Sequence, residues 1–199
     1  MNDALNWFLN HKLELAGTIS GFIYIFLSIR ASIWLWFVGF ITSAAYIFVF
    51  YQSGFYADMA LQIYYIIISV YGWIRWRYYK ADISEERPVV YSTAQQHVIY
   101  LSLTILGTLA IGYFLDTYTN SSVPYQDAFT TAGSIVGTYM LTEKQIDNWI
   151  YWIIVDAYSV YLYAQKDLYS TAILYTVYTC MAFIGYVQWR KKMNPALLA

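Results

Sequence analysis

The amino-acid sequence predicts an all-α integral membrane protein with seven transmembrane helices. Of its 199 residues, 60% are hydrophobic and only 12% are charged, whereas roughly 25% of the residues in a soluble domain are charged. Its 23 Tyr, 11 Phe and 8 Trp are more rings than a core of this size encloses, so many of them must face something other than water. A lipid bilayer satisfies both observations, and the chain divides into seven apolar stretches separated by polar breaks.

The polar breaks define the seven helices, because a helix needs about 17–25 mostly apolar residues to cross the hydrocarbon core. In order, the predicted helices are residues 13–29, 32–51, 55–76, 95–115, 127–142, 146–164 and 168–189. The first follows residues 1–12, which lack the basic region and cleavage site of a signal peptide, so we interpret it as a retained helix. Arg30 ends it, and the later breaks contain charged, Gly, Pro or Ser residues. The fifth helix is the shortest.

An internal repeat organises these helices. When the chain is displaced by 113 positions, Trp36 aligns with Trp149, Gln52 with Gln165, Tyr56 with Tyr169, Leu61 with Leu174, Tyr65 with Tyr178, Gly72 with Gly185, and Trp76-Arg77 with Trp189-Arg190. Residues 13–77 and 127–190 are therefore predicted to be two copies of a three-helix unit. Residues 78–126 form a linker that contains the fourth helix, and residues 191–199 form a tail, which gives a 3+1+3 arrangement.

The single linker helix sets the orientation of the two copies. It carries the chain back across the membrane, so both copies begin on the same side and are parallel repeats. With the N-terminus outside, nine of the 11 Lys and Arg residues are cytoplasmic, and only Lys12 and Lys166 are outside. This distribution agrees with the positive-inside rule and places the C-terminal tail in the cytoplasm.

A polar and aromatic stripe on the sixth predicted helix is the main candidate for a binding site. Asn148, Trp152 and Asp156 are spaced by four residues and share one helix face, with Trp149 beside them. A carboxylate near mid-membrane costs about 2.5–3.5 kcal/mol, and such groups usually serve function. We interpret Asp156 as the acceptor or counter-ion for a cationic substrate, and the tryptophans as rings that stack on it. The alternative is a structural carboxyl bonded to a hydroxyl of Thr42, Tyr65, Ser69 or Tyr178.

The first copy places small residues where the second has large ones. Gly39 and Ser43 align with Trp152 and Asp156, which predicts that one copy supplies functional side chains while the other leaves room for a ligand. The remaining candidates for the polar lining of a site between the repeats are Gln62, Tyr65, Ser69 and Tyr178. Hydrogen bonding between helices is an equally good interpretation of these four residues.

Other classes of function lack support in the sequence. It contains no phosphate-binding loop, no Ser/His/Asp arrangement and no cluster of metal ligands, so we predict neither an enzyme nor a bound cofactor or metal. Its net charge of −1 and the lack of a basic run argue against nucleic acid as a partner. Cys180 is the single cysteine, which excludes a disulfide within the chain.

Three segments together resemble the Pnu family of bacterial vitamin transporters. These are WLWFVGFITSAAYIFVFYQSGFYADMALQIYY, the following YGWIRW, and DNWIYW with its downstream polar residue. The resemblance implies a fold similar to that of the SWEET sugar transporters, a location in the bacterial inner membrane and a homotrimer. It also implies uptake by facilitated diffusion, with phosphorylation of the substrate inside the cell setting the direction.

The resemblance also bears on the substrate. In members that carry nicotinamide riboside, the position of Asp156 is typically Asn, which both donates and accepts hydrogen bonds. A carboxylate only accepts, which suits the amino group of thiamine, so this chain resembles the thiamine branch most. The alternatives are a nicotinamide riboside transporter and a proton-coupled vitamin carrier. A membrane receptor or scaffold without transport is a further alternative, which the asymmetric repeat disfavours.

Overall fold

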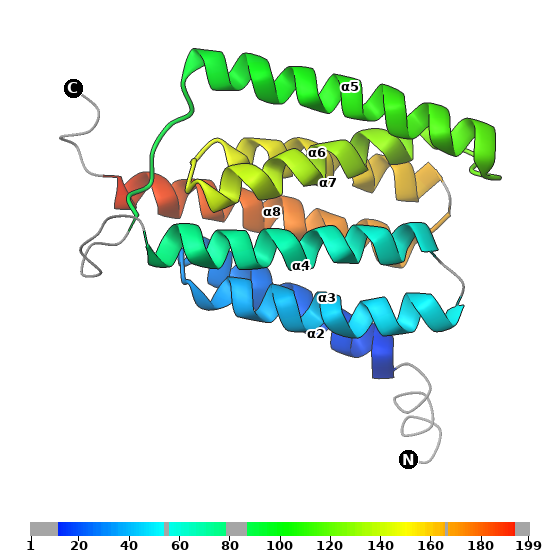
Figure 1. Cartoon of the computed structure of the whole chain (residues 1–199), viewed down its shortest axis with the longest axis horizontal. Coiled ribbons are helices and arrows are strands. Elements are labelled where there is room, and N and C mark those ends of the chain that lie inside the picture. Colours follow the sequence, from blue (N-terminus) through cyan, green and yellow to red (C-terminus); the bar gives the residue numbers. More distant parts are fainter. Residues whose placement is uncertain (1–11, 54–55, 79–86, 166, 194–199) are drawn as a thin grey trace. The chain divides into compact units, whose positions relative to one another are not determined.

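The computed structural model describes residues 12–53, 56–78, 87–165 and 167–193, and this part of the chain is all-helical (Figure 1). Its helices are α2 (Lys12–Ile29), α3 (Trp34–Ser53), α4 (Tyr56–Arg77), α5 (Ala94–Tyr118), α6 (Pro124–Thr142), α7 (Asn148–Gln165) and α8 (Tyr169–Lys192). All seven predicted helices are present, with ends within three residues of the predicted ones. Most of the predicted N-terminal segment, the centre of the 78–93 connection and most of the tail lie outside the described residues.

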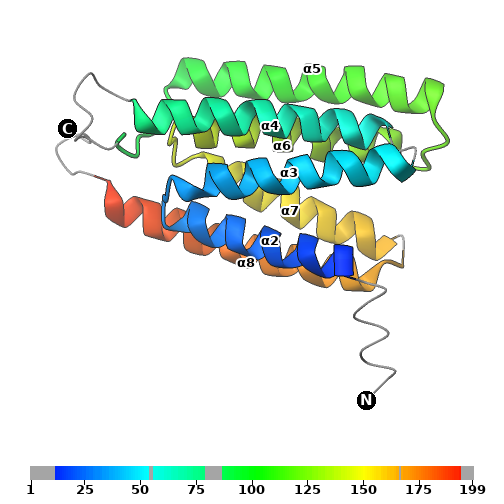
Figure 2. The same cartoon turned by 60° about the horizontal axis from the view of Figure 1, so that its bottom comes forward.

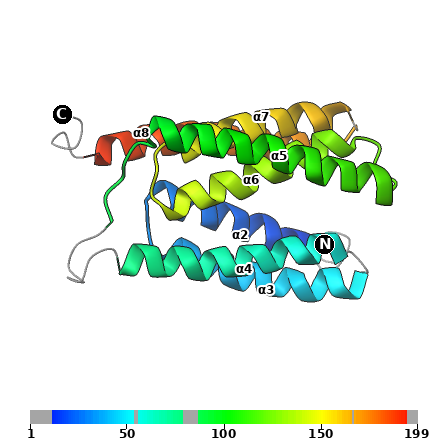
Figure 3. The same cartoon turned by 45° about the horizontal axis from the view of Figure 1, so that its top comes forward.

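The chain divides into two compact units, Met1–Arg77 and Tyr78–Ala199. In the first unit, α3 packs against both α2 and α4, as the ribbons in Figure 2 show. In the second unit, α5 packs on α6, α6 on α7, and α7 on α8 (Figure 3). The fourth predicted helix, which is α5, therefore packs with the helices that follow it in the sequence.

Two helices of the described chain are long and apolar enough to cross a membrane by length and composition, namely α5 and α8. Shorter apolar stretches are Ile19–Ile29 and Trp34–Phe48. On α5, the large side chains of Leu101, Leu103 and Leu106 are more than half exposed. A helix of this kind has an apolar surface that water does not favour and that lipid accepts.

The turn between α2 and α3 has the same backbone structure as the turn between α6 and α7. Ala31 and Lys144 both adopt a left-handed conformation, with φ of 53° and 50°, which a side chain with a Cβ rarely takes. The amide of Ala31 donates to the carbonyl of Ser28 at 2.9 Å, and that of Lys144 to the carbonyl of Leu141 at 3.0 Å. Ala31 and Lys144 are 113 residues apart, and so are Ser28 and Leu141, which is the displacement of the predicted repeat.

A second feature recurs at the same displacement. In the first unit Trp36 makes an edge contact with Trp76, with ring centroids 5.4 Å apart, and its ring covers Gly72, where an added Cβ would lie 2.5 Å from it. In the second unit Trp149 makes the same contact with Trp189 at 5.6 Å and covers Gly185, again at 2.5 Å. Each glycine thus lets a tryptophan lie directly on a helix backbone, and it fixes the register of α3 on α4 or of α7 on α8.

Candidate functional site

The polar and aromatic stripe predicted from the sequence lies on α7, which begins at Asn148. This residue is fully buried, and its Nδ2 donates a hydrogen bond to the carbonyl oxygen of Gln145 in the preceding turn. Its Oδ1 is also buried and has no hydrogen-bond partner in the described chain. A buried carbonyl oxygen without a donor costs about 1–3 kcal/mol, so this atom is suited to accept a hydrogen bond from a ligand.

Asp156 lies two turns further along the same face and is 5% exposed. Within the second unit, no described side chain donates a hydrogen bond to its carboxylate or forms an ion pair with it. Ser159, one turn on, instead bonds to its own helix, donating to the carbonyl of Val155 at 2.9 Å. No hydrogen bond joins Asp156 to Tyr178, one of the partners considered for a purely structural carboxyl.

The two tryptophans of the motif face different helices. Trp152 is half-buried and lies against Gly137 of α6, where an added Cβ would be 3.5 Å from its ring. Trp149 is only 2% exposed and is held between α7 and α8 by Gly185 and Trp189. Trp152 is thus the ring with room to meet a ligand, whereas the ring of Trp149 is enclosed by the helix pair.

Tyr178, the predicted site residue on α8, belongs to an aromatic cluster near the other end of α7. Its ring meets Tyr175 edge-on at 5.9 Å, and Tyr175 stacks on Tyr163 of α7 at 5.2 Å with an interplanar angle of 23°. This cluster joins α7 to α8 on the C-terminal side of Asp156.

The candidates of the first unit lie on α3 and α4. Gly39 and Ser69 are brought together, since a Cβ added to Gly39 would lie 3.1 Å from the Ser69 hydroxyl oxygen. Ser43 and Ser69 are each 5% exposed. Tyr65 contacts its neighbour Tyr64, with ring centroids 5.4 Å apart, and Gln62 is half-buried.

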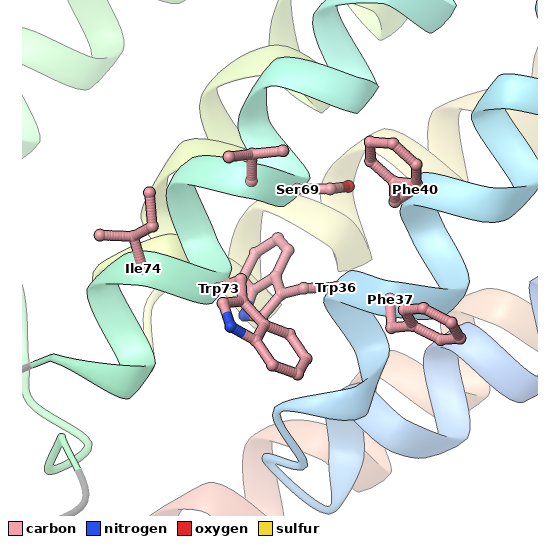
Figure 4. A pocket seen from close by; sticks show the side chains of 7 residues that line it. Trp36, Phe37, Phe40, Ser69, Trp73 and Ile74 are labelled. Carbon is pink, nitrogen blue, oxygen red and sulfur yellow. The ribbon is translucent and has the colours of Figure 1, made fainter. Parts of the chain in front are cut away.

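Ser69 also borders an apolar pocket between α3 and α4, into which its hydroxyl points near Phe40 (Figure 4). The residues that line this pocket are Trp36, Phe37, Phe40, Ser69, Val70, Trp73 and Ile74. The polar side-chain groups of these lining residues are the hydroxyl of Ser69 and the indole nitrogens of Trp36 and Trp73. Because no lining residue is charged, the pocket lacks the counter-ion that a cationic ligand needs.

Sequence analysis did not identify a set of residues that holds the start of α7. Glu143 and Lys144 were interpreted as part of a polar break and Asp147 as part of the sixth predicted helix, yet the three are only 9%, 4% and 6% exposed. Their described partners come from the segment before α5 and from the first turn of α5, at least 50 residues earlier in the chain, and include an ion pair between Arg87 and Glu143. The run of polar residues in TEKQIDN just before an apolar helix was the available signal, but it does not indicate which distant segment buries them.

Among the described residues, no group of three or more His, Cys, Asp or Glu side chains is placed to hold a metal ion. Long apolar helices that carry a buried ionisable residue are typical of membrane proteins in which such residues mark the path of an ion or a small polar molecule.

Comparison with known proteins identifies the family. The model of the nicotinamide mononucleotide transporter family matches residues 11–191, so the chain belongs to this family, and the resemblance to the Pnu family is confirmed. The chain is therefore a membrane transporter and not an enzyme.

Individual relatives are distant but cover most of the chain. The chain is 22% identical to the nicotinamide riboside transporter PnuC of Escherichia coli (strain K12), over 89% of the chain and 84% of the relative. It is 24% identical to the riboflavin/roseoflavin transporter RibM of Streptomyces davaonensis, over 92% and 89%. A crystal structure of the vitamin B3 transporter PnuC has a TM-score of 0.71 and 21% identity, and the match covers 96% of the chain and 85% of the PnuC chain, which shows a shared fold.

Proposed function

We propose that this protein carries a small cationic vitamin, with nicotinamide riboside as the first candidate, across the membrane by facilitated diffusion. The observation that carries the proposal is Asp156, a buried carboxylate with no partner in its own unit, in a chain of a transporter family. Relatives named as nicotinamide riboside transporters support this substrate over thiamine. The relatives compared above are named as nicotinamide riboside or riboflavin transporters and do not support the thiamine branch predicted from the sequence.

The stripe on α7 suits a flat cation with a hydrogen-bond donor. Asp156 supplies the negative charge, and the face of Trp152 adds a cation-π contact worth on the order of 1–2 kcal/mol when desolvated. Asn148 contributes its unpaired Oδ1, which accepts from an amide or amine. The rise from Asn148 to Asp156 is about 12 Å at 1.5 Å per residue, which suits an elongated ligand such as a ring joined to a sugar.

Thiamine remains the second candidate because of the chemistry of Asp156. A carboxylate accepts hydrogen bonds and does not donate them, so it fits an aminopyrimidine with a fixed positive charge at least as well as a carboxamide. Riboflavin is neutral and would leave the buried charge without compensation. We therefore rank riboflavin third, although one of the relatives is a riboflavin transporter.

Several parts of the proposal rest on the sequence. We assign Trp149, Gln62, Tyr65, Ser69, Tyr178, Gly39 and Ser43 to the substrate path as secondary positions. Because Asn148 and Asp156 are both buried, a ligand reaches them only after a rearrangement, for which parallel repeats in a 3+1+3 arrangement provide a mechanism. The proposal includes a homotrimer in the bacterial inner membrane, with the N-terminus outside, and no coupling to protons.

Competition binding on the purified protein tests the substrate. Nicotinamide riboside, thiamine and riboflavin are each titrated by calorimetry, and the tightest ligand is then used for counterflow in liposomes without a kinase or a proton gradient. We expect nicotinamide riboside to bind at least tenfold more tightly than riboflavin and to support counterflow. Thiamine as the tightest ligand would select the second candidate. Binding without counterflow would indicate a receptor, and counterflow that needs a pH gradient would indicate a proton-coupled carrier.

A further inference from the structure

The segment that precedes α5 pairs through its backbone with the turn between α6 and α7. The amide of Val90 donates to the carbonyl of Lys144 at 3.1 Å, and the amide of Ile146 donates back to the carbonyl of Val90 at 2.9 Å. Val90 and Gln145 thereby form an isolated parallel bridge. The turn is thus held by a backbone pairing between residues that are more than 50 positions apart.

Charged side chains reinforce this pairing on both sides. Arg87 forms an ion pair with the carboxylate of Glu143, and its Nε also donates to the backbone carbonyl of Glu143 at 3.1 Å. The side chains of the two residues are only about a tenth exposed, at 10% and 11%. On the other side, the amide of Ser92 donates to Oδ2 of Asp147 at 2.6 Å, and Nε2 of His97 lies 3.8 Å from the same oxygen.

The equivalent turn of the first unit has the same backbone geometry, and its described backbone groups pair with no distant segment. Among the described residues, the backbone groups of Ala31–Ile33 form hydrogen bonds only within the turn and with its flanking residues. Arg30 occupies the position that corresponds to Glu143, and its guanidinium lies 4.6 Å from the centroid of the Phe26 ring. Among the described residues, the pairing of a turn with a distant backbone segment is therefore seen at the turn that leads into α7.

We propose that the segment Arg87–Ser92 is a positioning element for the substrate site, and that Arg87 is its anchor. The clamped turn ends at Asp147, and α7 begins at the next residue, so holding the turn also fixes the first turns of α7. Asn148 and Trp152 project from those turns. Arg87 touches no substrate atom and acts only through Glu143. The part of this proposal that concerns substrate binding rests on the proposed function.

The chemistry of the pair dictates the variants that test it. Removing one partner of a buried ion pair leaves the other charge uncompensated, which commonly prevents folding, whereas neutralising both partners is often tolerated. The test variant is therefore the double substitution Arg87→Gln with Glu143→Gln. Arg87→Lys keeps the charge but loses the planar donor geometry that bonds carboxylate and carbonyl together. Arg30→Gln, at the corresponding position of the turn between α2 and α3, is the matched control.

Hydrogen exchange on the purified protein without ligand is the first measurement. We expect the amides of residues 145–152 to exchange at least tenfold faster in the double variant, an intermediate effect in Arg87→Lys, and no change in this segment in Arg30→Gln. Protection in α8 should persist in all three, which shows that the fold is intact. Unchanged exchange at 145–152 in the double variant would overturn the proposal.

Binding of nicotinamide riboside is the second measurement. We expect the affinity to fall about tenfold in the double variant, to be partly restored in Arg87→Lys, and to stay at the wild-type value in Arg30→Gln. Faster exchange with unchanged affinity would show that the clamp does not position the site. If the wild-type protein does not bind nicotinamide riboside, the proposed substrate is wrong, while the exchange data still decide whether the clamp holds α7.

Discussion

Asp156 combines two properties at the scale of a single residue. It lies within an apolar helix and is 5% exposed, yet its own unit offers no hydrogen-bond donor to its carboxylate. A buried charge without a partner lowers stability, and proteins retain such groups where binding needs them. The residue is therefore expected to cost stability in the absence of ligand and to contribute affinity in its presence.

Asp156→Asn separates these two effects because the amide has the same shape as the carboxylate and no charge. We expect the unliganded protein to gain about 1 kcal/mol, which raises Tm by about 2–4 °C for a chain of this size. Affinity for nicotinamide riboside should fall at least tenfold, while affinity for neutral riboflavin should not fall. Thermal unfolding in detergent and calorimetric titration measure the two effects. A loss of stability with unchanged affinity would show that Asp156 is structural.

At the same scale, the sequence identified the stripe but not the surroundings of its members. Helical spacing alone puts Asn148, Trp152 and Asp156 on one face. It does not show which neighbouring helix each ring meets, and the structure adds that Trp149, one of the predicted ligand contacts, lies against Gly185 and Trp189 of α8. The partners of Glu143 were likewise not predictable, because the pairing with Arg87 spans 56 positions and depends on the path of the connection.

At the scale of helices, most boundaries follow from apolar length and polar breaks. The largest differences occur at the start of α6 and at the ends of α5 and α8, the last of which continues to Lys192 rather than ending at residue 189. Helix α6 begins at Pro124 rather than at residue 127, because Pro is well suited to the first turn of a helix, where its missing N–H has no intrahelical partner. Helix α5 continues to Tyr118, beyond the predicted end at residue 115. Hydropathy alone does not register capping of this kind.

The contact between α6 and α7 depends on two glycines one turn apart, Gly133 and Gly137. A Cβ added to Gly133 would lie 2.5 Å from Cγ2 of Val155, whereas one added to Gly137 would have its nearest contact at 3.5 Å, an ordinary distance. Small residues spaced by four are a common means by which membrane helices approach closely. The two glycines therefore differ in what they tolerate.

Gly133→Ala should separate α6 from α7 and destabilise the protein by about 1–3 kcal/mol, as overpacking typically does. Removing the opposing methyl groups with Val155→Ala in the same chain should recover part of that loss. Gly137→Ala is the control and should be tolerated, because alanine favours the helix by about 1 kcal/mol over glycine. Thermal unfolding of the wild type, the two single variants, the double variant and the control measures the coupling. Additive effects of the two single substitutions would mean that Gly133 and Val155 do not compete for the same space.

At the scale of the whole molecule, the sequence repeat predicts that residues 13–77 and residues 127–190 are built alike. The structure provides local observations that agree with this prediction, namely the two turns with left-handed residues and the two Trp–Gly–Trp contacts. The indole Nε1 atoms of Trp36 and Trp149 are both buried without a hydrogen-bond partner in the described chain. Comparing the two copies by displacement does not predict that Arg87–Ser92 pairs with the turn between α6 and α7.

The duplicated contact allows stability and binding to be separated by a matched pair of substitutions. Gly72→Ala and Gly185→Ala each place a Cβ 2.5 Å from a tryptophan ring that is 1% or 2% exposed, so we expect each to destabilise the protein by about 1–3 kcal/mol. Affinity for nicotinamide riboside should fall more in Gly185→Ala than in Gly72→Ala, because the displaced ring of Trp149 adjoins Asn148, whereas Trp36 borders only the secondary position Ser69. Thermal unfolding and calorimetry on both variants provide the comparison. Equal loss of affinity in the two would show that binding follows global stability, and that α7 holds no special place in the site.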